Sequence, residues 1–175
     1  MRIGITFGCF IPLHKGHMAM ISKSRVLDDI TIIAVCGYDE DRGHDFIPFK
    51  DRYNLIKKIY QNDPKTIIIK IDDKKLGLDG TFTLKNWELW CNELFQNAGF
   101  NPNDNNEYIW YTGEQSYIDK ISKLYSNHSF ELLNRSIVPI SGTIIRKNPN
   151  LYKSMINPVF YEYLVSKKLL HIVSA

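Results

Sequence analysis

The chain has 175 residues, of which 44% are hydrophobic and 13% aromatic, and its formal net charge is +3. This length and apolar content suit one folded domain with a full core and argue against a disordered chain. The small, mixed charge predicts no nucleic-acid partner, and the lack of any apolar run of bilayer length predicts no membrane partner. Because a predicted strand follows Met1 at once, we expect no signal peptide and a cytoplasmic location.

The first predicted strand, residues 2–7, runs into a turn that is followed by two histidines. Pro12 delays the next helix to about His14, so His14 and His17 are expected to share its first turn and one of its faces. Free backbone N–H groups and the positive end of the helix dipole favour an anion at this position, which predicts a phosphate site. In the alternative interpretation of such a pair, one histidine caps the helix and the other packs in the core.

Strands and helices alternate along the rest of the chain. Continuous apolar runs such as residues 30–36 are typical of parallel strands covered on both faces. We therefore predict the α/β class and a doubly wound parallel sheet, whose ligands bind at the carboxyl ends of strands where the strand order reverses. The later predicted strands are 66–71, 108–112 and 130–133, the predicted helices are 15–27, 48–62, 84–97 and 116–125, and a long loop at 74–83 is expected to be functional.

A second motif lies late in the chain, at residues 140–146. Ser141 is a natural helix N-cap, and Thr143 and Arg146 would project from the same short helix. By itself, this pattern also fits a capped surface helix with a solvated arginine.

The three cysteines, Cys9, Cys36 and Cys91, are odd in number and lack the spacing of a metal site. They predict reduced thiols rather than a disulfide framework or a zinc site, and no metal-binding residue is assigned. Cys9 follows Gly8, a glycine that lets the backbone come close to a ligand, so Cys9 is expected near that ligand too.

Residues 8–17 read G-C-F-I-P-L-H-K-G-H, which resembles the G-x-F-x-P-x-H-x-G-H signature of the nucleotidyltransferase superfamily. Residues 140–146 resemble its later I-S-x-T-x-x-R signature. Over nearly the whole chain, the order of further elements is similar to that of nicotinamide mononucleotide adenylyltransferases of the NadR type. Those elements are Cys36-Gly37-Tyr38, Asp41-Arg42-Gly43, Pro48 with Arg52-Tyr53, Trp87-x-x-Trp90 and Gly113-Glu114.

This resemblance implies a Rossmann-like nucleotidyltransferase fold, with residues 1–168 as the nucleotidyltransferase domain. Residues 169–175 form a C-terminal tail that is similar to the start of the kinase domain found in longer family members. The chain contains no G-x-x-x-x-G-K-[ST] phosphate loop, so riboside kinase activity is not expected.

The activity implied by the resemblance is adenylyl transfer from ATP to nicotinamide mononucleotide (NMN), with NAD and pyrophosphate as products. Attack in line at the α-phosphorus needs alignment and charge stabilisation, and Mg²⁺ is expected to be carried by the ATP phosphates. His14, His17 and Arg146 are implied as catalytic residues. ATP binding is implied for these three and for Phe7, Gly8, Cys9, Phe10, Gly113, Ser141 and Thr143.

The resemblance implies Arg52, Arg42, Trp87 and Trp90 for NMN, and Lys15 is a further weak candidate. Arg52 is the candidate for the acceptor phosphate, with a surface salt bridge on a helix as the alternative, and Arg42 and Lys15 are weaker candidates. Trp87 and Trp90 are three residues apart on one predicted helix face, where an indole could contact the cationic nicotinamide ring. Ordinary core packing is the alternative for this tryptophan pair.

Two other functions stay open at this point. The acceptor could be another small phosphate, such as nicotinate mononucleotide, pantetheine phosphate or glycerol phosphate, or the chain could be a nucleotide sensor without turnover. The sequence is compatible with a homo-oligomer and contains no signal that determines the oligomeric state.

Overall fold

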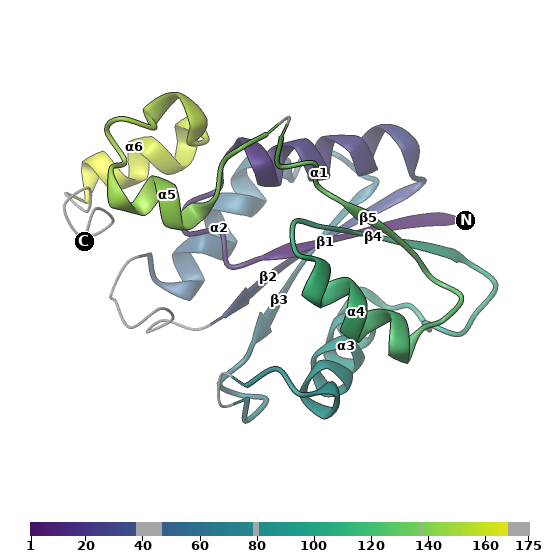
Figure 1. Cartoon of the computed structure of the whole chain (residues 1–175). Coiled ribbons are helices and arrows are strands. Elements are labelled where there is room, and N and C mark those ends of the chain that lie inside the picture. Colours follow the sequence, from purple (N-terminus) through teal and green to yellow (C-terminus); the bar gives the residue numbers. More distant parts are fainter. Residues whose placement is uncertain (38–46, 79–80, 137, 168–175) are drawn as a thin grey trace.

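The computed structural model describes residues 1–37, 47–78, 81–136 and 138–167. Within these ranges, helices follow strands in regular alternation from the N-terminus (Figure 1). The elements are β1 (Arg2–Gly8), α1 (Lys15–Leu27), β2 (Ile30–Gly37), α2 (Phe49–Tyr60), β3 (Thr66–Asp72), α3 (Leu84–Ala98), β4 (Glu107–Thr112), α4 (Gln115–Leu124), β5 (Ser129–Leu132), α5 (Gly142–Lys147), the 3₁₀ helix η2 (Lys153–Met155) and α6 (Pro158–Ser166).

The described strands form one parallel sheet in the order β3-β2-β1-β4-β5. From β1 the chain first moves outward to β2 and β3, and it then returns to the other side of β1 to form β4 and β5. The strand order therefore reverses between β1 and β4, and the helices that follow these two strands lie on opposite faces of the sheet, which leaves a crevice at their carboxyl ends. The predicted doubly wound, Rossmann-like α/β fold is confirmed.

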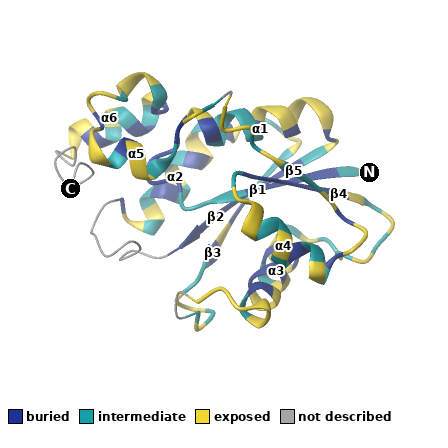
Figure 2. Cartoon of the chain, in the orientation of Figure 1, coloured by how far each residue is buried: buried dark blue, intermediate teal, exposed yellow. Residues whose placement is uncertain are grey.

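Helices cover both faces of the sheet, as Figure 1 shows. On one face, α3 and α4 pack against the strands through a core that includes Ile5, Leu94 and Ile121. On the other face, α1, α2, α5 and α6 share a second core that includes Val35 and Phe160. The central strands β1, β2 and β4 are consequently buried along most of their length, whereas the edge strands β3 and β5 and the outer faces of the helices are more exposed (Figure 2). This double burial explains why the strands read as continuous apolar runs.

The predicted helices and strands agree with the structure to within one or two residues at most ends. Helix α3 begins where the side chain of Thr83 accepts a hydrogen bond from the N–H of Asn86, and it ends at Gly99, whose φ of 79° closes the helix in the left-handed conformation. Local residues of this kind determine helix ends, which is why the sequence predicted them well.

Helix α6 has no counterpart among the predicted elements. The segment that leads into it is anchored by long-range contacts, because the backbone N–H of Asn157 donates to the carbonyl oxygen of Leu13 at 2.9 Å and Ile156 forms a bridge with His14. The C-terminal part of the described chain is thereby attached directly to the turn between β1 and α1. The predicted tail, residues 169–175, lies outside the described residues.

Candidate active site

A cavity of about 450 Å³ opens at the carboxyl ends of β1 and β4, where the strand order reverses. Its volume is in the range of small-molecule sites. All of the residues predicted for ATP line this cavity, although they come from segments more than 130 residues apart in the chain. These residues are Phe7, Gly8, Cys9, Phe10, His14, His17, Gly113, Ser141, Thr143 and Arg146. This cavity is called the motif-bearing cavity below, because both motifs contribute to it.

The two histidines cap helix α1 with their side chains. His14 is the N-cap residue, and its Nδ1 accepts a hydrogen bond from the N–H of Gly16 at 3.0 Å. His17, in the third helical position, accepts at Nδ1 from the N–H of His14 at 3.3 Å. The imidazole rings stack with their centroids 3.7 Å apart. Both rings therefore take part in the cap, whereas the alternative interpretation gave the cap to one ring and placed the other in the core. Both rings also line the cavity.

This arrangement determines the tautomer of each ring. An Nδ1 atom that accepts a hydrogen bond carries no proton, so each neutral imidazole holds its proton on Nε2. Burial, followed by the positive charges of Arg135 and Arg146, lowers the pKa of His14 to about 4. Burial, followed by His14 and the same two arginines, also lowers the pKa of His17 well below its usual value. Both rings are therefore neutral donors at neutral pH.

Gly16 and Phe10 shape the space around the two rings. A Cβ atom on Gly16 would lie 2.8 Å from Cε1 of His14, so a larger residue would displace the ring. Phe10 adopts the left-handed backbone conformation, with a φ of 55°, and its ring packs against His17 with the centroids 4.9 Å apart. Phe10 thus supports His17 from the turn.

Arg146 connects the late motif to the early one. Its Nη1 donates to the carbonyl oxygen of Ile11 at 2.8 Å, and its Nη2 contacts Oγ1 of Thr143 at 3.4 Å. Ser141 is the N-cap of α5, as predicted, because its side chain accepts from the N–H of Ile144. A Cβ on Gly142 would lie 2.8 Å from Nη1 of Arg146, so this glycine leaves room for the guanidinium.

Arg135 is a site residue that the sequence analysis missed. It lines the cavity, donates to the carbonyl oxygen of Ile140 and lies 3.9 Å from the carboxylate of Glu114. A Cβ on Gly113 would come within 2.4 Å of its Nη2, so the glycine at the end of β4 makes space for it. The only sequence signal was a cation six residues before Ser141, which resembles many surface arginines.

The other end of the cavity is aromatic. Trp87 and Trp90 line the cavity, yet their exposed fractions are only 3% and 2%, so they also belong to the core between α3 and the sheet. Phe7 packs edge-on against both indoles, with centroids 6.3 and 5.1 Å away, and Tyr117 lies 5.2 Å from Trp87. Core packing of this pair is therefore confirmed, and the predicted contact of an indole with the nicotinamide ring stays a prediction for a pair that also lines the cavity.

Of the cations predicted for NMN, the two that the structure describes, Arg52 and Lys15, are not among the residues that line this cavity. Arg52 is fully buried and donates to the carbonyl oxygens of Ile47, Cys9 and Cys36, which favours a structural role and excludes a surface salt bridge. Arg42 lies outside the described residues. Lys15 is exposed and lines a different cavity.

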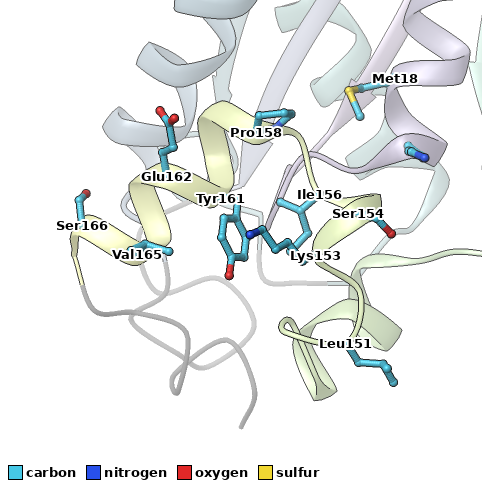
Figure 3. A pocket seen from close by; sticks show the side chains of 11 residues that line it. Met18, Leu151, Lys153, Ser154, Ile156, Pro158, Tyr161, Glu162, Val165 and Ser166 are labelled. Atoms are coloured by element: carbon cyan, nitrogen blue, oxygen red, sulfur yellow. The ribbon is translucent and has the colours of Figure 1, made fainter.

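That second cavity, of about 970 Å³, lies between the start of α1, the segment around η2 and helix α6 (Figure 3). Apolar side chains such as Met18, Tyr161 and Val165 make up much of its wall. Although larger, it contains none of the residues predicted for ATP.

No three or more histidine, cysteine, aspartate or glutamate side chains in the described ranges come together as a metal-holding group. No helix in the same ranges combines the length and the apolar character needed to cross a bilayer.

Residues 5–150 match the cytidylyltransferase-like family, and this segment contains both motifs and every described residue that lines the motif-bearing cavity. The chain belongs to the cytidylyltransferase-like family. Among solved structures, this family member resembles NadR protein in complex with NAD and AMP-PNP, with a TM-score of 0.72, 29% identity and 93% of the chain covered. The resemblance to the NadR type is confirmed.

Two curated relatives of this cytidylyltransferase-like chain differ in their acceptors. It is 22% identical to a probable nicotinate-nucleotide adenylyltransferase from Geobacter metallireducens over 98% of the chain and 76% of the relative. It is 32% identical to a phosphopantetheine adenylyltransferase from Kocuria rhizophila over 39% of the chain and 42% of the relative. The chain spans 46% of the NadR chain that it matches, and less than half of the Kocuria relative.

Proposed function

We propose that this chain transfers the adenylyl group of ATP to NMN, forming NAD and releasing pyrophosphate. The observation that carries the proposal is the histidine pair, in which both Nδ1 atoms are occupied by backbone N–H groups. Both rings are thereby prepared to donate from Nε2 to phosphate oxygens in a cavity that also contains Arg135 and Arg146. A preorganised set of donors of this kind stabilises charge that develops during phosphoryl chemistry.

In this mechanism, an oxygen of the NMN 5′-phosphate forms a bond to the α-phosphorus of ATP, while the bond from that phosphorus to the bridging oxygen of pyrophosphate breaks. The Nε2–H groups of His14 and His17 donate hydrogen bonds to the triphosphate. They stabilise the negative charge that develops on the leaving pyrophosphate. Arg146, which Ile11 and Thr143 hold in place, and Arg135 neutralise the pyrophosphate. No side chain needs to form a covalent intermediate, because alignment and electrostatics are sufficient.

Mg²⁺ is proposed to arrive on the triphosphate. When bound there, it would neutralise phosphate charge and polarise the reacting phosphorus. The donor set of the cavity fits this assignment, because the described residues contain no group of acidic or imidazole side chains that could hold the ion by themselves, whereas donors to phosphate are abundant.

The aromatic end of the cavity is proposed to hold the nicotinamide ring against Trp87. A cationic pyridinium is attracted to an indole face by about 1 to 2 kcal/mol. Asp73, which follows β3, lines the same cavity, and its N–H is anchored on the carbonyl oxygen of Gly37. The carboxylate of Asp73 can accept a hydrogen bond from a carboxamide and repels a carboxylate, which favours NMN over nicotinate mononucleotide.

The comparisons support this choice of reaction and leave the acceptor to experiment. The structurally similar NadR protein was solved with NAD and AMP-PNP, while the relatives named above act on nicotinate nucleotide and phosphopantetheine. The acceptor assignment therefore depends on the aromatic end of the cavity and Asp73.

The test is pyrophosphate release by the purified chain with MgATP and one acceptor at a time. NMN, nicotinate mononucleotide, pantetheine phosphate and glycerol phosphate should each be offered, with the dinucleotide product identified by mass. We expect NMN to give the highest kcat/KM. A preference for another acceptor would replace the substrate but keep the reaction, whereas ATP binding without pyrophosphate release from any acceptor would indicate a nucleotide sensor.

A further inference from the structure

Two cysteines come together at the floor of the motif-bearing cavity. In the pairing of β1 with β2, Gly8 lies opposite Val35, so continuing the register by one residue sets Cys9 opposite Cys36. Neighbouring strands are about 4.8 Å apart, and disulfides join residues whose Cα atoms are about 4.4 to 6.8 Å apart. The strand register therefore brings the two cysteines within disulfide range.

The side chain of Arg52 gives independent evidence for this proximity. A single nitrogen, Nη1, donates to the carbonyl oxygen of Cys9 at 2.7 Å and to that of Cys36 at 2.9 Å. Both backbones are thus held on one buried guanidinium group. Arg52 keeps the two cysteines side by side even though Cys9 follows the last residue of β1.

The thiols themselves are in contact, and they face the cavity. A hydrogen bond between the side chains of Cys9 and Cys36, followed by burial, raises the pKa of the Cys36 thiol well above its usual value. Both residues line the cavity, and Cys9 is half-buried whereas Cys36 is buried. Cys91, the third cysteine, is buried on α3 beside Tyr125 and does not line the cavity. The structure describes all three cysteines as unbridged.

We propose that Cys9 and Cys36 form a reversible disulfide that switches off nucleotide use at this site under oxidising conditions. This goes beyond the proposed function, and only the activity readout below depends on that function. Disulfides that form in reducing compartments are usually transient and redox-sensing, and a pair of neighbouring thiols at a ligand site fits that role.

The oxidant is a peroxide, and the reaction has two steps. In the first, the Cys9 sulfur attacks hydrogen peroxide, so that an S–O bond forms, the O–O bond breaks and one water leaves after proton transfer. In the second, the Cys36 sulfur attacks the Cys9 sulfenic acid, the S–S bond forms, and the thiol proton leaves with the hydroxyl group as a second water. Cys9 reacts first because its side chain is the more accessible one, and a dithiol reductant reverses the bond by exchange.

Bridging would disturb the histidine pair through a short path. Cys9 lies between Gly8 and Phe10, whose ring packs on His17. A Cβ on Gly8 would lie only 3.3 Å from the Phe10 ring, so the turn is closely packed and has little room to shift without moving that ring. Drawing the Cys9 sulfur toward Cys36 therefore shifts the residue that supports His17, and misplacement by about 1 Å can reduce turnover by about 10²-fold.

The test begins with the reduced 175-residue chain, which is treated with hydrogen peroxide and analysed by intact mass and peptide mapping. We expect loss of two hydrogen atoms and a cross-link between the Cys9 and Cys36 peptides. ATP binding should weaken, turnover should fall by roughly 10²-fold, and dithiothreitol should restore both. ATP bound beforehand should slow the cross-link, because both thiols face the cavity that ATP is proposed to fill.

Two variants complete the experiment. Cys91→Ala should respond to peroxide as the parent chain does, whereas Cys36→Ala should gain oxygen without losing two hydrogens. A cross-link that maps elsewhere, or none at a peroxide dose that oxidises Cys9, would overturn the site. A Cys9–Cys36 cross-link with unchanged ATP binding would overturn the switch. If the chain does not turn over NMN, the mass and ATP-binding results still decide the inference, so its failure is distinct from failure of the proposed function.

Discussion

Nη1 of Arg146 donates a hydrogen bond to the carbonyl oxygen of Ile11 at 2.8 Å, across 135 positions of sequence. This contact joins the late helix α5 to the turn that precedes the two histidines. It uses one nitrogen of a guanidinium that also lines the cavity. The two motifs, which are separate in the sequence, therefore line one continuous cavity.

The first prediction concerns this arginine. Arg146→Lys keeps the charge but cannot bond Ile11 and a phosphate through separate nitrogens of one rigid fork. We expect kcat/KM for ATP to fall by roughly tenfold in Arg146→Lys and by roughly 10²-fold in Arg146→Ala. Arg25→Lys, which alters an exposed ion pair with Asp63, is the matched control and should behave as the parent. Normal ATP kinetics in Arg146→Lys would mean that any cation at this position suffices.

The second prediction separates capping from catalysis at His14. Asparagine is a good N-cap residue but has no imidazole, so His14→Asn should retain stability and lose turnover. His14→Ala should lose turnover and, in addition, about 1 kcal/mol of unfolding free energy. The expected loss of kcat is roughly 10²-fold in both, and also in His17→Ala, because each removes a donor to developing charge. Steady-state kinetics and urea unfolding measure the two effects. Full turnover in His14→Asn would show that the His14 side chain only caps the helix and has no role in catalysis.

The third prediction follows from the lowered pKa of His14, which burial and then the two arginines bring to about 4. The unfolded chain has an ordinary histidine pKa of about 6.5. Between these values the unfolded state binds a proton that the folded state does not, so stability should fall as the pH drops from about 6.5 toward 4. The full effect of this group is about 3 kcal/mol. Urea unfolding without ligand should therefore show a smaller pH slope in His14→Asn, and an unchanged slope would contradict the assignment.

The fourth prediction places Trp87 against the nicotinamide ring. Because Trp87 is buried among Phe7, Trp90 and Tyr117, we choose Trp87→Phe over a truncation that would open a cavity. KM for NMN should rise several-fold, up to about tenfold, with little change for ATP. NMN should quench the fluorescence of the parent and much less that of Trp87→Phe. Trp110→Phe, which alters a core residue outside the cavity, should retain the quench.

The fifth prediction concerns acceptor choice. Asp73→Asn removes a negative charge from the cavity wall after β3 while keeping a hydrogen-bonding group. The ratio of kcat/KM for NMN to that for nicotinate mononucleotide should fall by roughly tenfold, mainly because the nicotinate acceptor improves. Asp119→Asn, on an exposed part of α4, is the matched control. An unchanged ratio would move the discrimination to another part of the cavity.

The sequence by itself determined most elements of the fold and the two motifs whose residues line the candidate cavity. Strand and helix positions depend on local periodicity, caps and turn residues, all of which can be read within a short window. The two histidines and Arg146 could be identified because their motifs contain closely spaced, chemically unusual combinations. All the residues predicted for ATP then came to one cavity, because parallel strands end at the same edge of the sheet.

Only the tertiary structure decided the roles that depend on distant partners. Arg52 and Arg135 are both arginines in polar stretches of sequence. Arg52 is buried against backbone carbonyl oxygens, whereas Arg135 lines the cavity, because the packing of the two cores determines which cations reach it. The proximity of Cys9 to Cys36 could be inferred only from the register of β1 with β2. The segment that leads into helix α6 is positioned by a hydrogen bond to Leu13, which is distant in the sequence. Sequence patterns report local conformation, whereas long-range contacts depend on how the whole chain closes on itself, which no short window contains.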